Sequence, residues 1–211
     1  MIAVGRSDDR LSATCAAIHA AGGHALAAIC DITFEEQVAR MFEQVETERG
    51  PVGILVNNAG TFAAGAVEDV TVDEWRRVLD VNLTGTFLCM REALRRMKPR
   101  KSGRILNIGS ISSFVPRPMS APYAASKAGL VGLTRTAALE ARSHGISVGC
   151  LHPGNVLTDM RQDLATEMNR EPMMRVEEVA ELARAMLMVD PGSSVWELTA
   201  LPIEQPYLGR G

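Results

Sequence analysis

Tyr123 and Lys127 lie four residues apart in the segment Tyr-Ala-Ala-Ser-Lys. On a helix, residues at this spacing are neighbours on one face. A phenol with a pKa of about 10 cannot accept a proton near neutrality, but a nearby ammonium favours the phenolate and lowers that pKa. The pair therefore predicts a general acid and base at Tyr123. Taken alone, it also fits a half-exposed tyrosine beside a solvated lysine.

Other polar residues follow apolar segments. Ser110 ends the apolar stretch after Arg104, thirteen residues before Tyr123, and its hydroxyl could donate to a substrate carbonyl oxygen. Asn57 closes an earlier apolar segment, and the carboxyl ends of strands are where open α/β sheets build their sites. Asn82 stands inside a long amphipathic segment, where an asparagine competes with the backbone and needs a structural or functional reason.

Short apolar runs that alternate with longer helical patterns must position these residues. Expected strands are Ile2–Gly5, Ala25–Asp31, Gly53–Asn57, Gly103–Gly109, Ser147–His152 and Val195–Leu201. Expected helices are Asp8–Ala21, Thr33–Arg49, Asp73–Lys98, Pro122–His144 and Glu177–Met188. Thr71 and Glu74 predict a capping box at the start of the third helix. The alternation predicts an α/β fold, a Rossmann-like, doubly wound parallel sheet in three α/β/α layers.

Composition sets limits on the kind of protein. With 46% hydrophobic and 22% charged residues, the 211-residue chain is expected to form one globular domain, residues 1–211, with a flexible lid at about 155–176. A net charge of −3 without a basic cluster predicts no nucleic-acid partner. The sequence has no apolar stretch long enough to span a bilayer, and its start lacks the pattern of a signal peptide. A cytoplasmic location is therefore expected. The four scattered cysteines predict buried thiols and no metal site.

Together, five short sequence motifs resemble those of the short-chain dehydrogenase/reductase family. Asn-Asn-Ala-Gly at 57–60, Asn82 in a long helix, Ser110, the Tyr123/Lys127 pair and Pro-Gly-x-x-x-Thr at 153–158 stand in family order. The resemblance implies that Tyr123 exchanges a proton with the substrate oxygen, which Ser110 polarises. It also implies that Lys127 lowers the pKa of Tyr123 and holds the nicotinamide ribose. Asn82 would hold the proton path behind Lys127 through a kink in its helix and a water.

The same resemblance implies a nicotinamide cofactor. Asn57, Ala59 and Gly60 would line its groove, and Asp31 would meet the adenine; Pro153, Gly154 and Thr158 would support the nicotinamide. Arg6 stands where the second family strand ends, at a place where an acidic residue binds the ribose of NAD and arginine accommodates the 2′-phosphate of NADP. NADP(H) is therefore favoured over NAD(H), with a solvated Arg6 paired to Asp8 or Asp9 as the alternative.

The chain also departs from the family pattern. The first strand and its glycine-rich turn, a unit of roughly 30 residues, are expected to be missing, because Met1 falls just before the second family strand. Neighbouring strands would then lack ladder partners, and cofactor binding would weaken. The C-terminal segment resembles family members that act on small hydroxy acids, aldehydes and diverse ketones. Met160, Leu164, Met168, Met173 and Met174 fit either an adaptable lid or core.

These observations are consistent with two alternative functions. The first is an oxidoreductase that moves a hydride between NADP(H) and a small-molecule carbonyl or alcohol substrate. The second is a catalytically silent fragment that acts as an oligomerising interaction module through its two long helices, Asp73–Lys98 and Pro122–His144. A homodimer or homotetramer is expected under either. An inert scaffold gives no reason to keep Asn82, Ser110, Tyr123 and Lys127 together, which favours the enzyme.

Overall fold

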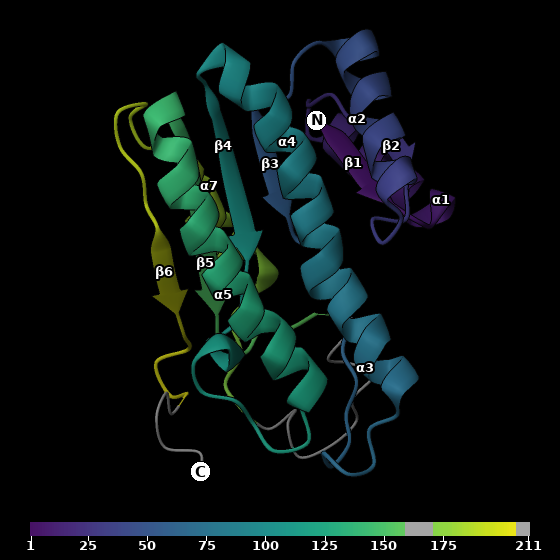
Figure 1. Ribbon diagram of the computed structural model, residues 1–211, viewed down its shortest axis with the longest axis vertical. Coiled ribbons are helices and arrows are strands. Elements are labelled where there is room, and N and C mark those ends of the chain that lie inside the picture. Colours follow the sequence, from purple (N-terminus) through teal and green to yellow (C-terminus); the bar gives the residue numbers. More distant parts are fainter. Residues whose placement is uncertain (159–170, 206–211) are drawn as a thin grey trace.

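The computed structural model describes residues 1–158 and 171–205 and is an α/β protein with parallel strands (Figure 1). The strands are β1 (Ile2–Gly5), β2 (Leu26–Ile29), β3 (Ile54–Asn57), β4 (Gly103–Ile108), β5 (Ile146–Pro153) and β6 (Glu197–Ala200). The helices are α1 (Asp8–Ala20), α2 (Glu35–Arg49), α3 (Val72–Leu79), α4 (Thr86–Arg100), α5 (Ala121–Ala141) and α7 (Val176–Leu187). Each expected strand and helix lies within a few residues of an observed one.

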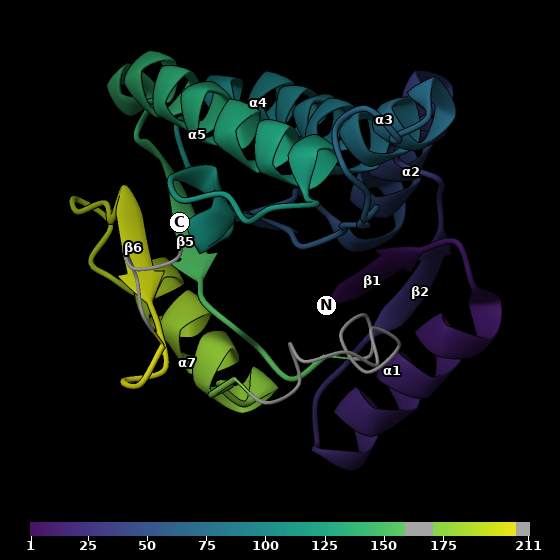
Figure 2. The ribbon, with the colours of Figure 1, turned by 90° about the horizontal axis from the view of Figure 1, so that it is seen from below.

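Helices cover both faces of the strands, which confirms the three-layer arrangement. Figure 2 shows α2, α3, α4 and α5 on one side and α1 and α7 on the other. The largest buried cluster joins α4 and α5 to β4 and β5, with Met97, Ile105 and Val148 each at most 2% exposed. Both β4 and β5 contribute to two separate buried clusters, Ile105 and Val148 to one and Leu106 and Leu151 to the other, as expected of strands covered on both faces. This core fixes the carboxyl ends of the two strands that carry candidate site residues.

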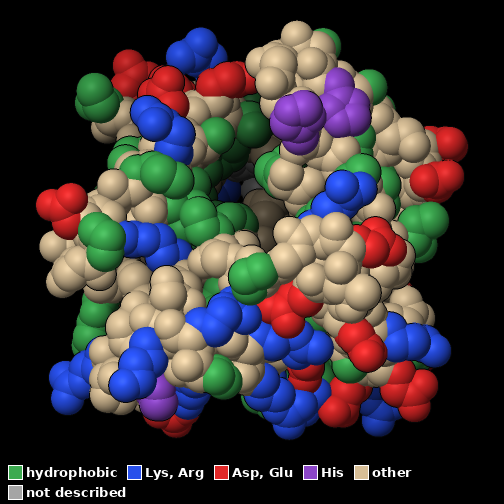
Figure 3. All heavy atoms as spheres, turned by 90° about the horizontal axis from the view of Figure 1, so that it is seen from above, with side chains coloured by type: hydrophobic (Ala, Val, Ile, Leu, Met, Phe, Trp, Pro, Cys, Tyr) green, Lys and Arg blue, Asp and Glu red, His purple; other side chains and the backbone are tan. Residues whose placement is uncertain are grey.

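The strands form two separate parallel sheets, in the orders β1-β2 and β3-β4-β5-β6. Among the described residues, no strand pairs with the free edges of β1 and β3, and Val4, Ile54 and Val56 stay 41%, 45% and 44% exposed. Backbone groups along those two edges therefore lack a strand partner within the described residues. Seen from the amino ends of the strands, the molecule has a deep central hollow partly lined by hydrophobic side chains (Figure 3).

Helical periodicity predicts Asp73–Lys98 as one long helix, and residues 72–100 are helical throughout, although not α-helical throughout. A π-helical turn, η1 (Asp80–Gly85), separates α3 from α4. The side chain of Asn82 points out of this turn to the backbone of Thr61, and the hydroxyl of Thr86 donates to the carbonyl oxygen of Asn82 at 3.0 Å. The wider turn thus places a buried amide against a neighbouring segment, which helical periodicity alone does not reveal.

The capping signal in the sequence, which depends on residues close together in the chain, predicts the start of α3 correctly. The hydroxyl of Thr71 accepts from the backbone N–H of Glu74 at 3.2 Å, and the Glu74 carboxylate accepts from the N–H of Thr71 at 3.1 Å. The predicted capping box is confirmed. All four cysteines are buried free thiols, as expected. No helix within the described part of the chain is both long and apolar enough to cross a membrane.

Candidate active site

Helix α5 carries Tyr123 and Lys127 on its first turns. The Lys127 ammonium donates to the carbonyl oxygen of Ile108, at the end of β4, at 2.7 Å, and its nitrogen lies 5.7 Å from the centre of the Tyr123 ring. Lys127 is 5% exposed, so it is buried rather than solvated. The Tyr123 ring packs edge-on against Phe62 at 5.3 Å. The four-residue spacing thus puts a buried cation beside a phenol at the carboxyl edge of the sheet.

Burial changes the acidity of Lys127. Desolvation is the main cause and lowers its pKa to about 8. Burial raises the pKa of the Cys150 thiol to about 12, so that thiol is neutral at physiological pH. Lys127 therefore remains largely protonated near pH 7, although the protein interior makes its positive charge costly.

Ser110 lies two residues after the end of β4 and is 9% exposed. Its hydroxyl oxygen accepts from the N–H of Ser112 at 3.1 Å, a contact that leaves the hydroxyl hydrogen available to donate. Behind it, Nδ1 of the fully buried His152 lies 3.3 Å from the Ser110 carbonyl oxygen. Since Lys127 binds the carbonyl two residues earlier in the same segment, Ser110 lies near the start of α5.

Asn82 joins two segments through its side chain. Its amide oxygen accepts from the N–H of Thr61 at 2.8 Å, and its amide nitrogen donates to the Thr61 carbonyl at 2.9 Å and to the Ser126 hydroxyl at 3.0 Å. Ser126 in turn donates to the Tyr123 carbonyl at 2.7 Å. This network explains why an asparagine is buried there. The sequence analysis does not identify Thr61 or Ser126, although Ser126 stands inside the Tyr-Ala-Ala-Ser-Lys segment.

Of the residues at the end of β3 that are expected to line a cofactor groove, one is buried in the sheet and two are exposed. Asn57 is 9% exposed and directs its amide nitrogen to Asn107 at 2.8 Å, so its side chain joins β3 to β4 inside the sheet. Ala59 and Gly60 follow β3 and are exposed. The unpredicted Asn107 also donates to Thr134 at 2.8 Å. Its signal in the sequence is a lone amide within an apolar strand.

Arg6 and Asp31 lie at the carboxyl ends of β1 and β2, in the other sheet. The two form an ion pair at 3.7 Å, in which the Arg6 side chain is 73% exposed. Partial burial opposes ionisation of Asp31, but hydrogen bonds from Thr33 and the charge of Arg6 outweigh it and lower the pKa of that carboxyl. Arg6 therefore pairs with Asp31, a partner that the sequence does not suggest.

The end of β5 and the loop that follows it contain three further predicted residues. Pro153 ends the strand, and Gly154 is closely packed: a Cβ there would lie 2.4 Å from Oε1 of Gln205 and 2.9 Å from Leu201. Thr158 is the last residue before positions 159–170. That range holds much of the predicted lid, including Met160, Leu164 and Met168, and lies outside the described residues.

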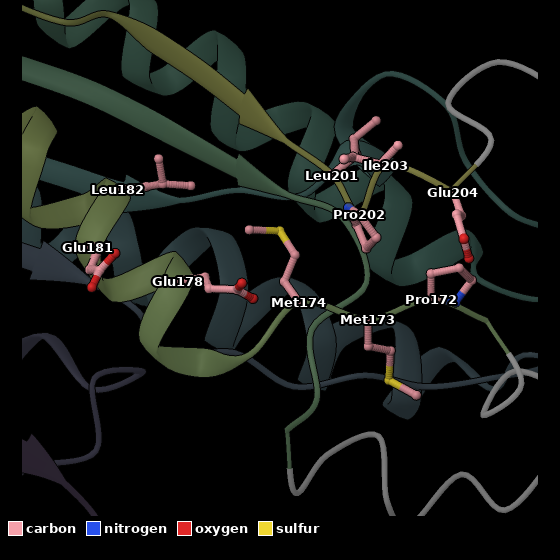
Figure 4. A pocket seen from close by; sticks show the side chains of 10 residues that line it. All are labelled: Pro172, Met173, Met174, Glu178, Glu181, Leu182, Leu201, Pro202, Ile203 and Glu204. Carbon is pink, nitrogen blue, oxygen red and sulfur yellow. The ribbon is translucent and has the colours of Figure 1, made fainter.

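Met173 and Met174 line a cavity of about 550 Å³ between α7 and the segment after β6 (Figure 4). Leu182, Leu201, Pro172, Pro202 and Ile203 add apolar surface, and Glu178, Glu181 and Glu204 add carboxylates. Neither methionine belongs to the fully buried core. None of the predicted catalytic residues lines this cavity, so we place the candidate active site at the ends of β4 and β5 instead.

A substitution at Gly109 tests how tightly the residues behind Ser110 are packed. A Cβ at this position would lie 2.5 Å from Nδ1 of His152 and 2.9 Å from Sγ of Cys150, both fully buried. Gly109→Ala should lower the free energy of unfolding by about 1–3 kcal/mol in a urea titration. Gly132→Ala is the matched control, because nothing lies within 4 Å of its Cβ, and it should raise stability by about 0.5–1 kcal/mol. Equal effects would contradict tight packing behind Ser110.

Comparisons with known proteins agree on one family. Residues 1–169 match the family described as short chain dehydrogenase. The chain is 34% identical over 198 residues to a 3-oxoacyl-[acyl-carrier-protein] reductase of Synechocystis sp., covering 90% of this chain and 78% of that protein. It is 41% identical over 160 residues to the trans-4-hydroxycyclohexanecarboxylate dehydrogenase of Sinomonas cyclohexanicum, covering 75% of this chain and 61% of that protein.

Two solved structures are also similar. A putative gluconate dehydrogenase from Agrobacterium tumefaciens superposes with a TM-score of 0.85 at 31% identity, covering 94% of this chain and 83% of that chain. A gluconate 5-dehydrogenase from Burkholderia cenocepacia, in complex with NADP and tartrate, superposes with a TM-score of 0.84 at 26% identity, covering 95% and 83%. These matches extend the likeness from sequence to the arrangement of both sheets.

Proposed function

The chain belongs to the short chain dehydrogenase family and is an oxidoreductase, and we propose that it transfers a hydride between NADP(H) and a carbonyl or secondary alcohol substrate. The observation that carries this proposal is the Lys127 ammonium, buried at the end of β4 and 5.7 Å from the Tyr123 ring centre. A cation at this distance favours the ionised form of a phenol. Tyr123 is the proposed general acid and base.

Each neighbouring residue has a distinct role in this proposal. Ser110 donates its hydroxyl hydrogen to the substrate oxygen and polarises the carbonyl, while Tyr123 gives that oxygen a proton during reduction and takes it back during oxidation. Lys127 keeps positive charge beside Tyr123. Asn82, bonded to Ser126 and through it to the first turn of α5, supports the position of Tyr123 and Lys127.

A bound nicotinamide would supply the hydride chemistry, and the protein would supply position, a proton and charge. The residues proposed to hold NADP(H) are Arg6, Asp31, Asn57, Ala59, Gly60, Tyr123, Lys127, Pro153, Gly154 and Thr158. They fit because they follow the carboxyl ends of β1, β2, β3 and β5 or begin α5, the edge at which open parallel sheets bind nucleotides. The largely exposed guanidinium of Arg6 supports a contact with the 2′-phosphate of NADP.

Two comparisons support an acid as substrate. The relatives from Sinomonas cyclohexanicum and Burkholderia cenocepacia are named for hydroxy acids. We therefore propose a small molecule that bears both an alcohol or carbonyl and a carboxylate. A homodimer or homotetramer is also proposed, supported by the exposed side chains of Trp75, Phe87 and Leu139 on α3, α4 and α5.

Cofactor binding is the first test. Titration of the 211-residue chain with NADPH and NADH, followed by nicotinamide fluorescence, should give saturable binding with NADPH preferred. Arg6→Gln should weaken NADPH binding roughly 10-fold, the value of one charge-assisted phosphate contact, and leave NADH binding within about twofold. Arg49→Gln is the matched control, since Arg49 is an exposed arginine at the C-terminal end of α2.

Saturable binding with no preference would contradict the role of Arg6 but support an oxidoreductase that uses NAD(H). If neither cofactor bound, the proposed activity of this chain would be wrong. Light scattering would then test the remaining candidate, an oligomerising interaction module. That candidate is supported by the unpaired edges of β1 and β3 in the described part of the chain, with their exposed Val4, Ile54 and Val56.

A further inference from the structure

A second polar cluster, made of Arg117, Asn155 and Glu171, lies beside the candidate active site. One carboxylate oxygen of Glu171 accepts two hydrogen bonds, from Nη2 of Arg117 at 2.9 Å and from Nδ2 of Asn155 at 2.6 Å. The same Nη2 also donates to Oδ1 of Asn155 at 2.9 Å. A guanidinium and an amide therefore converge on a single carboxylate.

The cluster is largely shielded from solvent. The Arg117 side chain is 20% exposed and the Glu171 side chain 8%, while Asn155 as a whole is 5% exposed. Hydrogen bonds between ionised partners are shorter and stronger than neutral ones, and reduced access of water strengthens them further. Chemically, Arg117 and Asn155 form a receptor for a carboxylate, and the chain's own Glu171 binds to it in this structure.

The receptor is built on two segments that lead into the active site. Arg117 belongs to the loop that runs from Ser110 to Tyr123, where the Ser120 hydroxyl donates to its carbonyl oxygen at 2.7 Å. Asn155 comes directly after the Pro153-Gly154 turn, and its backbone N–H donates to Oε1 of Gln205 at 2.7 Å. These segments leave the neighbouring strands β4 and β5 at the same edge of the sheet.

We propose that Arg117 and Asn155 bind the carboxylate of a hydroxy acid or oxo acid substrate, which displaces the carboxylate of Glu171. The reacting alcohol or carbonyl, on another carbon of the same molecule, then lies toward Ser110 and Tyr123. The inference rests on the proposed oxidoreductase function and names the residues that select the acid. Glu171 is the internal competitor, which keeps the receptor satisfied when no substrate is bound.

The large cavity beside α7 does not offer an equivalent site. Its lining includes Glu178, Glu181 and Glu204 and none of the described Lys or Arg residues, so it would repel an acid. Both sites lie near the segment 171–174, so they differ in the charge of their lining rather than in their position. Of the two, only the Arg117 cluster already binds a carboxylate.

The test compares trans-4-hydroxycyclohexanecarboxylate with its uncharged carboxamide. Calorimetric titrations, without cofactor and with saturating NADP⁺, should show that the chain binds the acid more tightly than the amide. Arg117→Gln should weaken acid binding roughly 10- to 100-fold and change amide binding by less than about twofold, because only the acid carries the charge that Arg117 pairs. Glu171→Gln should tighten acid binding roughly 3- to 10-fold by weakening the internal competitor. Arg135→Gln, which breaks the Arg135–Glu197 pair on α5 and β6, is the matched control and should change neither.

The proposal is wrong if Arg117→Gln lowers acid and amide binding together, or if Glu171→Gln leaves acid binding unchanged. Should Arg117→Gln fail to fold by circular dichroism, Arg117→Lys keeps the charge and should retain part of the preference for the acid. Acid binding that depends on Arg117, without any binding of NADPH or NADH, would support the receptor while the proposed function fails. Cofactor binding with equal affinity for acid and amide would support the proposed hydride transfer, but it would overturn both the receptor and the choice of an acid as substrate.

Discussion

Tyr123→Phe should lower kcat by roughly 10²- to 10⁴-fold, the range that loss of a positioned general acid produces. The substitution removes only the hydroxyl and keeps the ring that packs against Phe62 at 5.3 Å. Because the ring and its packing remain, the variant should stay folded in a urea titration and should still bind NADPH. The measurement is the initial rate of NADPH oxidation with a carbonyl substrate, paired with a cofactor titration of the same sample.

Thr136→Val is a suitable control for this change. It deletes an exposed hydroxyl from the same helix, α5, and should leave the rate unaltered. Full activity in Tyr123→Phe would mean that another group moves the proton, and the assignment of Tyr123 would have to be abandoned.

Lys127→Met should lower turnover by roughly 10²-fold or more without unfolding the protein. The pKa of Lys127, lowered by burial from 10.5 to about 8, corresponds to a cost of about 3 kcal/mol for holding its charge inside the native protein. Removing the ammonium relieves that cost but leaves the Ile108 carbonyl without its 2.7 Å donor, at about 1–3 kcal/mol. The two effects offset each other, so the free energy of unfolding near pH 7 should change by no more than about 2 kcal/mol.

The pH dependence of this difference has a definite sign. Below about pH 8, Lys127 is protonated in both states, and the cost of its buried charge is fully present. Between pH 8 and 10.5 the native state loses the proton while the unfolded state keeps it, so the unfolded state binds more protons and stability rises with pH. Lys127→Met lacks this contribution, and the variant should lose stability relative to the unaltered chain as pH rises.

Urea unfolding of both proteins at about pH 7 and about pH 9.5, on either side of the lowered pKa, measures this difference directly. Other titrating groups act equally in the two proteins and cancel in the comparison. Identical pH slopes would contradict the buried ammonium, and a collapse of Lys127→Met near neutral pH would mean that the ammonium is needed for folding.

What the sequence determined by itself was local or periodic. The capping box of Thr71 and Glu74 depends on residues three apart, and it formed as predicted. The Tyr123/Lys127 pair depends on one helical turn, and alternating apolar runs predicted the parallel α/β layers. These features succeed because backbone hydrogen bonding and side-chain periodicity act over a few residues.

Tertiary structure decided which distant groups meet. Asn82 bonds to Thr61 and Ser126, 21 and 44 residues away, from a π-helical turn within the long helix that periodicity predicted. Arg6 pairs with Asp31 because β1 and β2 end side by side, and Arg117 reaches Glu171 across 54 residues. No spacing rule connects such residues. Their contacts form only when packed strands and helices bring their ends together, because partners for buried polar groups are chosen by the fold as a whole.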